Sequence, residues 1–461
     1  MTVRIHIIDH VHSSIDPKGI KKIKPCVEFK SERWYTHGYG MGSTTRKDVA
    51  INKDGTFLTG LVPRIKEYCT EKNIEAKVIR GRNALNRIRF IEPNVKGIET
   101  KTKQGREQFA VLEKIKENRR GVVLFPTGSG KTVIAALVIS SLNGKNILFL
   151  CHTKDIFFKT RDAFKNYGFK KVAMYGGGIK DDIFSSSITL AMIQSFAKID
   201  PRKYCSYYDC VIVDEAHHIN SLDSQYGHVL QRMLASVRLG FTATLHSEKE
   251  KQLNLEGLMG PVIANMTQRE AIKKEILAKP IFSLINVPYN TATAKYYRYR
   301  DLYEWGIVKN RVRNRLIIKE VLKYKKRGMT SLILIKEIEH GEQILKLAKL
   351  SGLKAQFVHG GTVGEQREAV AGLLNDKKVF CVIASVIWKE GIDIPSLDHV
   401  VNAFGGKGEI PTVQVPGRGQ RTDKGKKSVF YVTDFLDPYK FLSQHAVFRL
   451  QIYKSKGWLN H

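Results

Sequence analysis

An apolar run that ends in a glycine-rich loop constrains the fold of this 461-residue chain more than any other feature. Residues 121–132 read GVVLFPTGSGKT, a pattern that predicts a buried strand followed by a helix opening at the lysine. Backbone N–H groups freed by Gly128 and Gly130 can surround a phosphate, and the positive end of the helix dipole adds to the attraction. Lys131 would reach the β- and γ-phosphates of a nucleotide, and the Thr132 hydroxyl would hold Mg²⁺.

The loop departs from the usual phosphate-binding pattern at its first position. Phe125 stands where G-x-x-x-x-G-K-[ST] has its first glycine. A tight strand-to-helix turn without a ligand is therefore the alternative interpretation. If the loop does bind a nucleotide, seven consecutive residues form its cradle: Pro126, Thr127, Gly128, Ser129, Gly130, Lys131 and Thr132.

A second apolar run ends in two acidic residues. Residues 210–213 are Cys-Val-Ile-Val, and Asp214-Glu-Ala-His follows directly. Carboxylates at the C-terminal end of a parallel strand lie where open α/β sheets bind ligands. Asp214 would hold Mg²⁺ through water, and Glu215 would polarise the water that attacks the γ-phosphate. An exposed acidic turn is the alternative, but the apolar residues before the pair favour a nucleotide-hydrolysing site.

Further segments, in the same order along the chain, resemble the motifs of superfamily 2 helicases. Residues 126–132 and 214–217 are similar to motifs I and II, and residues 239–244 (LGFTAT) are similar to motif III. Residues 383–395 resemble motif V, and residues 414–421 (QVPGRGQR) fit the Q-x-x-G-R-x-x-R pattern of motif VI.

Within the superfamily the chain most resembles phage branch-migration helicases of the UvsW type, with RecG-like and XPB-like helicases as relatives. Residues 57–66 (FLTGLVPRIK) and 257–261 (GLMGP) carry this finer resemblance. The chain also departs from the family pattern, because Leu245 stands where many relatives have proline and Ser385 where threonine is usual.

The resemblance implies roles for residues outside the phosphate loop. Motif VI would complete the catalytic set with Gln414, Arg418 and Arg421, the two arginines acting as arginine fingers from the opposite lobe. Gln108 would read the adenine, although Gln104 competes for that role because no complete RxxQ precedes motif I.

The resemblance also predicts how ATP and nucleic acid communicate. Gly391 and Asp393 would line the cleft near the ribose and phosphates. Coupling would run through His217, Thr242 and Thr244, although the two threonines could instead cap the helix that follows. Nucleic acid would be held, without reading bases, by Thr153, Lys154, Thr189, Met192, Gln194, His359, Gly360 and Ser385.

The charge of the chain points to a polyanionic partner. Its 76 Lys and Arg residues exceed its 44 Asp and Glu residues, for a formal net charge of +32. Nucleic acid is favoured over an acidic membrane because no amphipathic anchor or lipidation motif is present, and a basic surface kept for solubility is the alternative. The six cysteines include no C-x-x-C pair, and no apolar stretch is long enough to span a membrane, so we expect a cytosolic protein.

Alternating strand and helix patterns over residues 100–250 and 331–433 predict an α/β fold with two tandem RecA-like parallel-sheet lobes. The second lobe has no phosphate loop, so the two would share one nucleotide. The expected domains are a small α+β accessory domain that binds duplex DNA (residues 1–95), lobe 1 with motifs I to III (96–255), a basic helical connector (256–330), lobe 2 with motifs IV to VI (331–440) and a basic terminal helix (441–461).

These features together predict an ATP-dependent DNA helicase that uses ATP and Mg²⁺ to unwind or branch-migrate forked and junction DNA. Three alternatives remain open at this level: a duplex DNA translocase that separates no strands, an RNA helicase, and a DNA-binding scaffold with a degenerate ATPase. Phe125 supports the scaffold, whereas the intact Lys131 and Asp214 oppose it.

Overall fold

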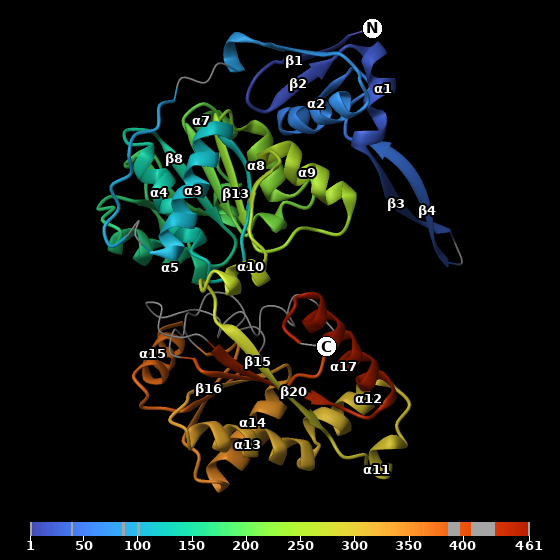
Figure 1. Cartoon of the computed structure of the whole chain (residues 1–461), viewed down its shortest axis with the longest axis vertical. Helices are drawn as coiled ribbons and strands as arrows, with labels where there is room; N and C mark the ends of the chain where they lie inside the picture. The colour runs from blue at the N-terminus through green and yellow to red at the C-terminus, as the bar shows by residue number, and fades with distance from the viewer. Residues whose placement is uncertain are drawn as a thin grey trace. The chain divides into compact units, whose positions relative to one another are not determined.

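The computed structural model describes residues 2–37, 40–84, 88–98, 102–362, 364–385, 397–406 and 429–459. The chain divides into two compact units (Figure 1). The first carries the residues up to 266 apart from the loop 126–129, and the second carries that loop and residues 267–461. Among the described helices, none is both long and apolar enough to cross a membrane.

The first unit begins with a small α+β domain, as predicted. Its sheet has the order β5-β2-β1-β6, in which only the β1–β6 pair is parallel. Alternate residues of β1 are buried, so the sheet has one face in the core and one towards solvent. The elements are β1 (Val3–Ile7), β2 (His12–Ile15), α1 (Pro17–Val27), β3 (Glu28–His37), β4 (Gly40–Val49), β5 (Thr56–Leu58), α2 (Val62–Glu71) and β6 (Ala76–Arg80).

The rest of the first unit is an eight-stranded sheet of order β10-β9-β11-β8-β12-β13-β7-β14, parallel except at β10. Its central strands are buried along their whole length, as expected where helices cover both faces. The elements are α3 (Lys103–Asn118), β7 (Arg120–Leu124), α4 (Lys131–Ser141), β8 (Ile147–Cys151), α5 (Lys154–Asn166), β9 (Ala173–Gly176), β10 (Ile179–Lys180), β11 (Ile188–Met192), α6 (Ile193–Phe196), α7 (Pro201–Tyr204), β12 (Cys210–Asp214), η3 (Ala216–His218), α8 (Gln225–Arg232), β13 (Val237–Thr242), α9 (Lys249–Met259) and β14 (Val262–Asn265).

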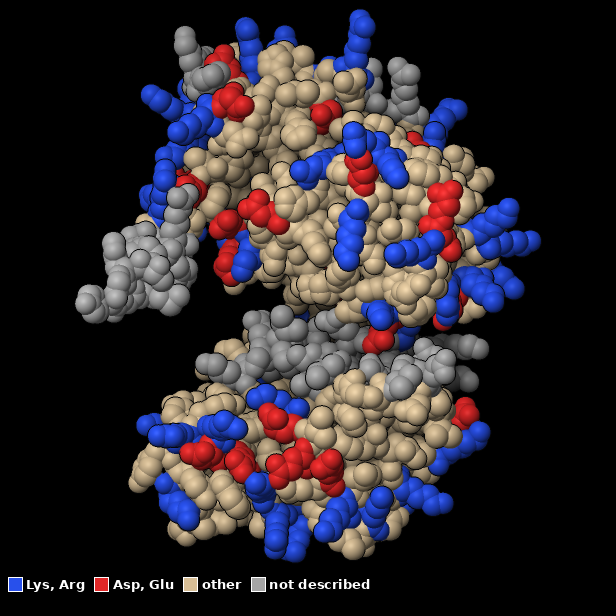
Figure 2. All heavy atoms as spheres, turned by 180° about the vertical axis from the view of Figure 1, so that it is seen from behind, with Lys and Arg blue, Asp and Glu red and all other residues tan. Residues whose placement is uncertain are grey.

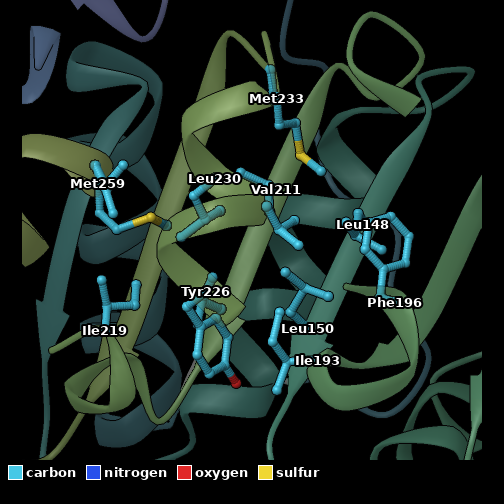
Figure 3. Packing of buried hydrophobic residues seen from close by; sticks show 14 of the residues in the cluster. Leu148, Leu150, Ile193, Phe196, Val211, Ile219, Tyr226, Leu230, Met233 and Met259 are labelled. Atoms are coloured by element: carbon cyan, nitrogen blue, oxygen red, sulfur yellow. The ribbon is translucent and has the colours of Figure 1, made fainter. Parts of the chain in front are cut away.

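One face of this sheet packs on α6, α8 and α9. Figure 3 shows side chains of β8 and β12, such as Leu148 and Val211, meeting Phe196 and Leu230 from the helices. Tyr226 of α8 belongs to the same cluster, and its hydroxyl lies at the edge of the apolar side chains, beside Ile193. This core fixes the strand ends that carry the predicted motifs.

The small domain and lobe 1 meet through the two segments that carried the finer family resemblance. The backbone at Gly60 lies so close to α9 that a Cβ there would collide with the carbonyl oxygen of Glu256 and lie 2.5 Å from that of Gly257. The Arg64 guanidinium donates to both carboxylate oxygens of Glu256, with N···O distances of 2.6–2.9 Å. Leu253 of α9 completes the core of the small domain.

The second unit contains a six-stranded parallel sheet of order β15-β20-β19-β16-β18-β17. The elements are α10 (Gln268–Lys273), β15 (Lys279–Asn286), α11 (Thr291–Ala294), α12 (Tyr299–Tyr303), α13 (Arg311–Lys325), β16 (Ser331–Ile335), α14 (Ile338–Leu350), β17 (Ala355–Val358), α15 (Gly364–Asn375), β18 (Cys381–Ser385), β19 (His399–Asn402), β20 (Val429–Leu436) and α17 (Lys440–Ser455).

The segment 256–330, predicted as a basic helical connector, contains helices but also two strands. This segment holds β14, an edge strand of the first sheet, and β15, an edge strand of the second. Both are only partly buried, and β15 carries Lys279 and Pro280 at its start. Edge strands lack the long apolar runs of central strands, which explains why the pattern did not reveal them.

Two buried arginines hold the C-terminal ends of the strands in the second unit. Arg313 of α13 pairs with Asp437 and donates to the carbonyl of Ala403. Arg449 of α17 pairs with Asp434, and its guanidinium also donates to the carbonyl of Gly406 at 3.0 Å. These guanidiniums satisfy buried carboxylates and strand-end carbonyls at the same time.

Candidate functional site

The predicted phosphate loop joins β7 to α4. Gly128 and Gly130 have φ values of 86° and 90°, a region that favours glycine, and Gly130 is the N-terminal cap of α4. Inside the loop, the Ser129 hydroxyl donates to the Pro126 carbonyl at 2.7 Å. Phe125 is buried, and its N–H donates to the carbonyl of Thr242 on β13. Phe125 therefore fills the core, which gives its departure from the glycine pattern a physical reason.

Lys131 lies within the electrostatic reach of both acidic residues. Its ammonium donates to the Phe125 carbonyl at 3.2 Å. Burial, together with the charge of Glu215, raises the pKa of Asp214 to about 6, and the Lys131 charge opposes this rise. The pKa of Glu215 is lowered, because a hydrogen bond from His217 and the charges of Lys131 and His217 outweigh its burial.

The two glutamines that competed for the adenine-reading role both lie against the phosphate loop. A Cβ at Gly130 would collide with the Gln108 amide nitrogen and lie 3.0 Å from that of Gln104. Gln108 is buried, whereas Gln104 is half-buried. Both belong to α3, so the structure places this helix beside the loop and leaves the choice between the two open.

The acidic pair is connected to the end of β13. Glu215 has a φ of 51°, unusual for a residue with a side chain, and such strain is typical of functional sites. His217 Nδ1 lies 3.3 Å from Glu215 Oε2 and 3.1 Å from Thr242 Oγ1. The Thr242 hydroxyl in turn donates to the Thr244 carbonyl. The three residues predicted to couple ATP to nucleic acid therefore form one contact chain with Glu215.

These residues fit a nucleotide with a divalent cation. The loop offers backbone N–H groups at the start of an eleven-residue helix, and Asp214 is a half-buried carboxylate whose charge a cation would stabilise. No group of three or more His, Cys, Asp or Glu side chains suited to a metal is found in the part of the chain that the structure describes. Mg²⁺ in phosphate sites typically takes only one or two protein ligands and keeps its waters, so a site with only Thr132 and Asp214, the two predicted ligands, fits this pattern.

The start of α5 is the best-formed candidate for a nucleic-acid contact. Thr153 is the N-terminal cap of this helix, with its hydroxyl accepting from the Ile156 N–H, and Lys154 beside it is exposed. A helix N-terminus with a neighbouring ammonium can hold a phosphate of a nucleic-acid backbone.

Three other predicted contacts in lobe 1 require correction. Thr189 is fully buried, with its hydroxyl donating to the Ile183 carbonyl and accepting from Tyr208. Met192 is buried at the end of β11, and the amide of Gln194 donates inwards to the His152 carbonyl at 2.8 Å. The structure therefore assigns these side chains to internal packing and gives no support to a nucleic-acid contact there.

In lobe 2, too, some of the predicted nucleic-acid contacts lie at the surface and others are buried. His359 and Gly360 follow β17 and reach the surface, where the His359 ring accepts from the Gly361 N–H. Ser385, the last residue of β18, is buried, so a contact there is not supported either. Five further predicted residues lie outside the described residues: Gly391, Asp393, Gln414, Arg418 and Arg421.

Two histidines that sequence reasoning missed lie beside the site. The rings of His152 and His218 stack with centroids 4.0 Å apart and planes inclined by 13°. His152 follows β8 directly, and His218 follows the motif II histidine. Their positions next to predicted motifs were the only available signal, since nothing in the spacing places two such rings together.

Two family models match the chain. Residues 87–247 match the family model described as "Type III restriction enzyme, res subunit". Residues 313–423 match the model described as "Helicase conserved C-terminal domain".

Relatives extend over most of the chain. The "ATP-dependent DNA helicase uvsW" of Enterobacteria phage T4 is 24% identical, over 95% of this chain and 91% of its own. "Putative helicase 22" of a Sulfolobus islandicus filamentous virus is 22% identical, over 95% of this chain and 80% of its own. A "Putative DNA 3'-5' helicase Rad25" of Halobacterium salinarum is 26% identical, over 70% of this chain and 52% of its own.

Solved structures show the same fold. Dbp5 of S. cerevisiae bound to RNA and ADP BeF3 has a TM-score of 0.54 at 15% identity, covering 77% of this chain and 88% of its own. A fragment of a putative HsdR subunit of a type I restriction enzyme from Vibrio vulnificus YJ016 has a TM-score of 0.52 at 14% identity, covering 89% and 87%. With these two models matched in order, a relative named as an ATP-dependent DNA helicase aligned along the chain, and the phosphate loop, acidic pair and coupling residues gathered at one sheet edge, the chain belongs to superfamily 2 of the ATP-dependent helicases.

Proposed function

We propose that this helicase acts on DNA, and that it separates strands or moves branch points at forks and junctions. One observation carries the proposal more than any other. Lys131, Asp214 and Glu215 lie at the same sheet edge as the His217–Thr242 contact. Helix α5 starts just after β8, which lies two strands from β13 in the same sheet. A single rigid edge can therefore serve both ATP and a nucleic-acid backbone.

The chain's own residues divide the chemistry of ATP hydrolysis. The Lys131 ammonium would neutralise the terminal phosphates, and Glu215, kept ionised by its neighbours, would orient and polarise the attacking water. Thr132 and Asp214 would hold Mg²⁺, which supplies charge neutralisation at the phosphates. Arg418 and Arg421 remain predicted arginine fingers.

The choice of DNA rests on relatives and on charge. The phage T4 relative carries the name of a DNA helicase and aligns with nearly the whole chain. Figure 2 shows Lys and Arg side chains outnumbering acidic ones over the visible face of each unit. In the small domain, Arg80, Arg82 and Arg89 are exposed and could contact a duplex. Such contacts give affinity without sequence preference, and that affinity falls with salt. Action in the cytosol, where such DNA is accessible, completes the proposal.

The experiment compares ATP hydrolysis and strand release on single-stranded, duplex, forked and four-way DNA and on single-stranded RNA. We expect forked or four-way DNA to give the largest stimulation together with strand release. Stimulation by duplex DNA without strand release would favour the translocase, and stimulation by RNA alone would favour an RNA helicase. Binding without any ATP turnover would leave only the scaffold.

A further inference from the structure

Three histidine rings bridge two neighbouring strand ends in lobe 1. β8 and β12 are parallel neighbours, with Leu150 paired to Val213, so the residues that follow them emerge at the same edge. His152 follows β8, whereas His217 and His218 lie in η3 after β12. We call His152, His218 and His217 the histidine bridge.

The contacts along the histidine bridge are continuous. The His152 ring stacks on His218 at 4.0 Å, and the His218 ring lies 4.4 Å from His217. His217 then contacts Glu215 and Thr242, the water-polarising carboxylate and the hydroxyl at the end of β13. His246, beyond motif III, contacts the His217 carbonyl. The last ring is therefore held from three sides.

The other end of the bridge reaches the start of α5. His152 directly precedes Thr153, the cap of that helix. The Gln194 amide donates to the His152 carbonyl at 2.8 Å and lies 3.5 Å from its ring nitrogen. A phosphate bound at the α5 N-terminus would therefore lie next to the backbone that carries the first ring of the bridge.

Burial keeps the His218 ring neutral. Burial, with the charges of His217 and His152 adding to it, lowers the pKa of His218 to about 4. Its ring is therefore uncharged near pH 7, so the stack with His152 is free of a charge on His218. The bridge acts through ring position and needs no proton transfer.

Two buried polar groups lie close to the bridge. Among the described residues, the Tyr226 hydroxyl and the Gln194 side-chain oxygen are buried without a hydrogen-bond partner. Tyr226 is 3% exposed, and its hydroxyl leaves the apolar cluster next to Ile193, the residue before Gln194 (Figure 3). The ionisable groups that act on the Tyr226 hydroxyl are those of Cys151, Asp214 and Glu215. Buried polar groups normally find partners, so a small shift that pairs them would be favourable.

The backbone of Glu215, at the other end of the bridge, is strained. Its φ of 51° lies in the left-handed region of backbone conformation, which is unfavourable for a residue with a side chain. Glu215, with its strained backbone, lies at one end of the bridge, and Gln194, with its unpaired side-chain oxygen, lies at the other, so a change in the ring stack would reach both.

We propose that the histidine bridge positions Glu215 in response to nucleic acid bound at the start of α5, with His152 and His218 as positioning residues. The inference rests on the proposed function, because it assumes that nucleic acid binds beside Thr153. It adds His152 and His218 to the contact between His217 and Thr242 of motif III.

The test measures the ATP turnover number with and without saturating forked DNA, the KM for ATP, and the DNA Kd by fluorescence anisotropy. The variants are His152→Ala, His218→Ala, the double variant, and His152→Phe, which keeps a planar ring. His228→Ala, an exposed histidine on α8, is the matched control. If His152→Ala does not fold, His152→Asn replaces it, since it keeps polarity but loses the ring.

We expect His152→Ala to lower the stimulation by DNA about 5- to 20-fold while the DNA Kd and the KM change less than about twofold. His152→Phe should recover most of the stimulation, and the double variant should be no worse than either single one, because both remove the same stack.

Equal loss of basal and stimulated turnover, or additive effects in the double variant, would overturn the histidine bridge, as would unchanged stimulation in His152→Ala when the wild type responds to DNA. A wild-type protein that DNA does not stimulate would overturn the proposed function and the bridge with it.

Discussion

The close approach of Gly60 to α9 predicts a measurable effect of a single methyl group. Gly60 lies in a short 3₁₀ turn, and its φ is not in the positive range that strains a side chain, so alanine is acceptable for the backbone itself. The obstacle is space, because the new carbon would collide with the Glu256 carbonyl oxygen and lie 2.5 Å from that of Gly257.

The size of the effect follows from this geometry. An ordinary C···O contact is about 3.3 Å or longer, so the small domain and α9 must separate by about 1 Å. Forcing an extra methyl into a packed contact costs about 1–3 kcal/mol. The Arg64–Glu256 contacts of 2.6–2.9 Å would also be lost, but Arg64 is 37% exposed, so this adds less than about 1 kcal/mol.

Hydrogen exchange provides the assay. In Gly60→Ala, amides of α2 and α9 should exchange about 5- to 150-fold faster, the equivalent of 1–3 kcal/mol, while β16 in the second unit should not change. Gly372→Ala is the control, because a Cβ there meets nothing within 4 Å and alanine favours its helix. Wild-type protection of both α2 and α9 in Gly60→Ala would refute the argument that backbone contact joins the small domain to lobe 1.

Three further predictions concern the ATP site and lobe 2. Lys131→Ala should lower ATP turnover about 10²–10³-fold with little change in DNA binding, and an undiminished rate would contradict the phosphate-loop assignment. His340 and His399 are buried, and burial lowers both pKa values to about 3, so their contribution to stability is complete above pH 6.5 and is lost as the pH falls. Between pH 7.5 and pH 5, hydrogen exchange at β16 and β20 should therefore report a loss of about 2 kcal/mol of stability per histidine. The variant His399→Gln should remove half of this loss. Arg449→Met should destabilise lobe 2 by about 3–5 kcal/mol in urea unfolding, because Asp434 would stay buried without its partner, whereas Lys454→Met on the exposed side of the same helix should be neutral.

Much of the architecture could be predicted because central parallel strands are apolar along their whole length. The runs before the phosphate loop and before Asp214 became β7 and β12, and the corresponding runs of lobe 2 became β16, β18 and β20. β15 was missed because an edge strand exposes half of its residues, and its basic surroundings favoured a helical interpretation.

The candidate site was predictable only where a motif fixes both residue type and backbone. Asp214 ends the buried strand β12, His217 lies in the short turn after it, and Lys131 opens α4 after the loop that follows β7. Thr189 and Gln194 show the limit of such reasoning, since a polar residue at a strand end can bond inwards as readily as outwards. The stack of His152 on His218 depends on two strands that are distant in sequence, so only the fold could reveal it.

The strand order of lobe 2 has a consequence for how this protein is made. β15 is the first strand of its sheet to leave the ribosome, yet its neighbour β20 is the last, some 150 residues later. Until Val429–Leu436 arrives, β15 has no partner on that side, and Asp434 and Arg449 cannot meet. Lobe 1 closes its own sheet by Asn265, so it can fold while its partner is still an open-edged intermediate that is prone to mispairing.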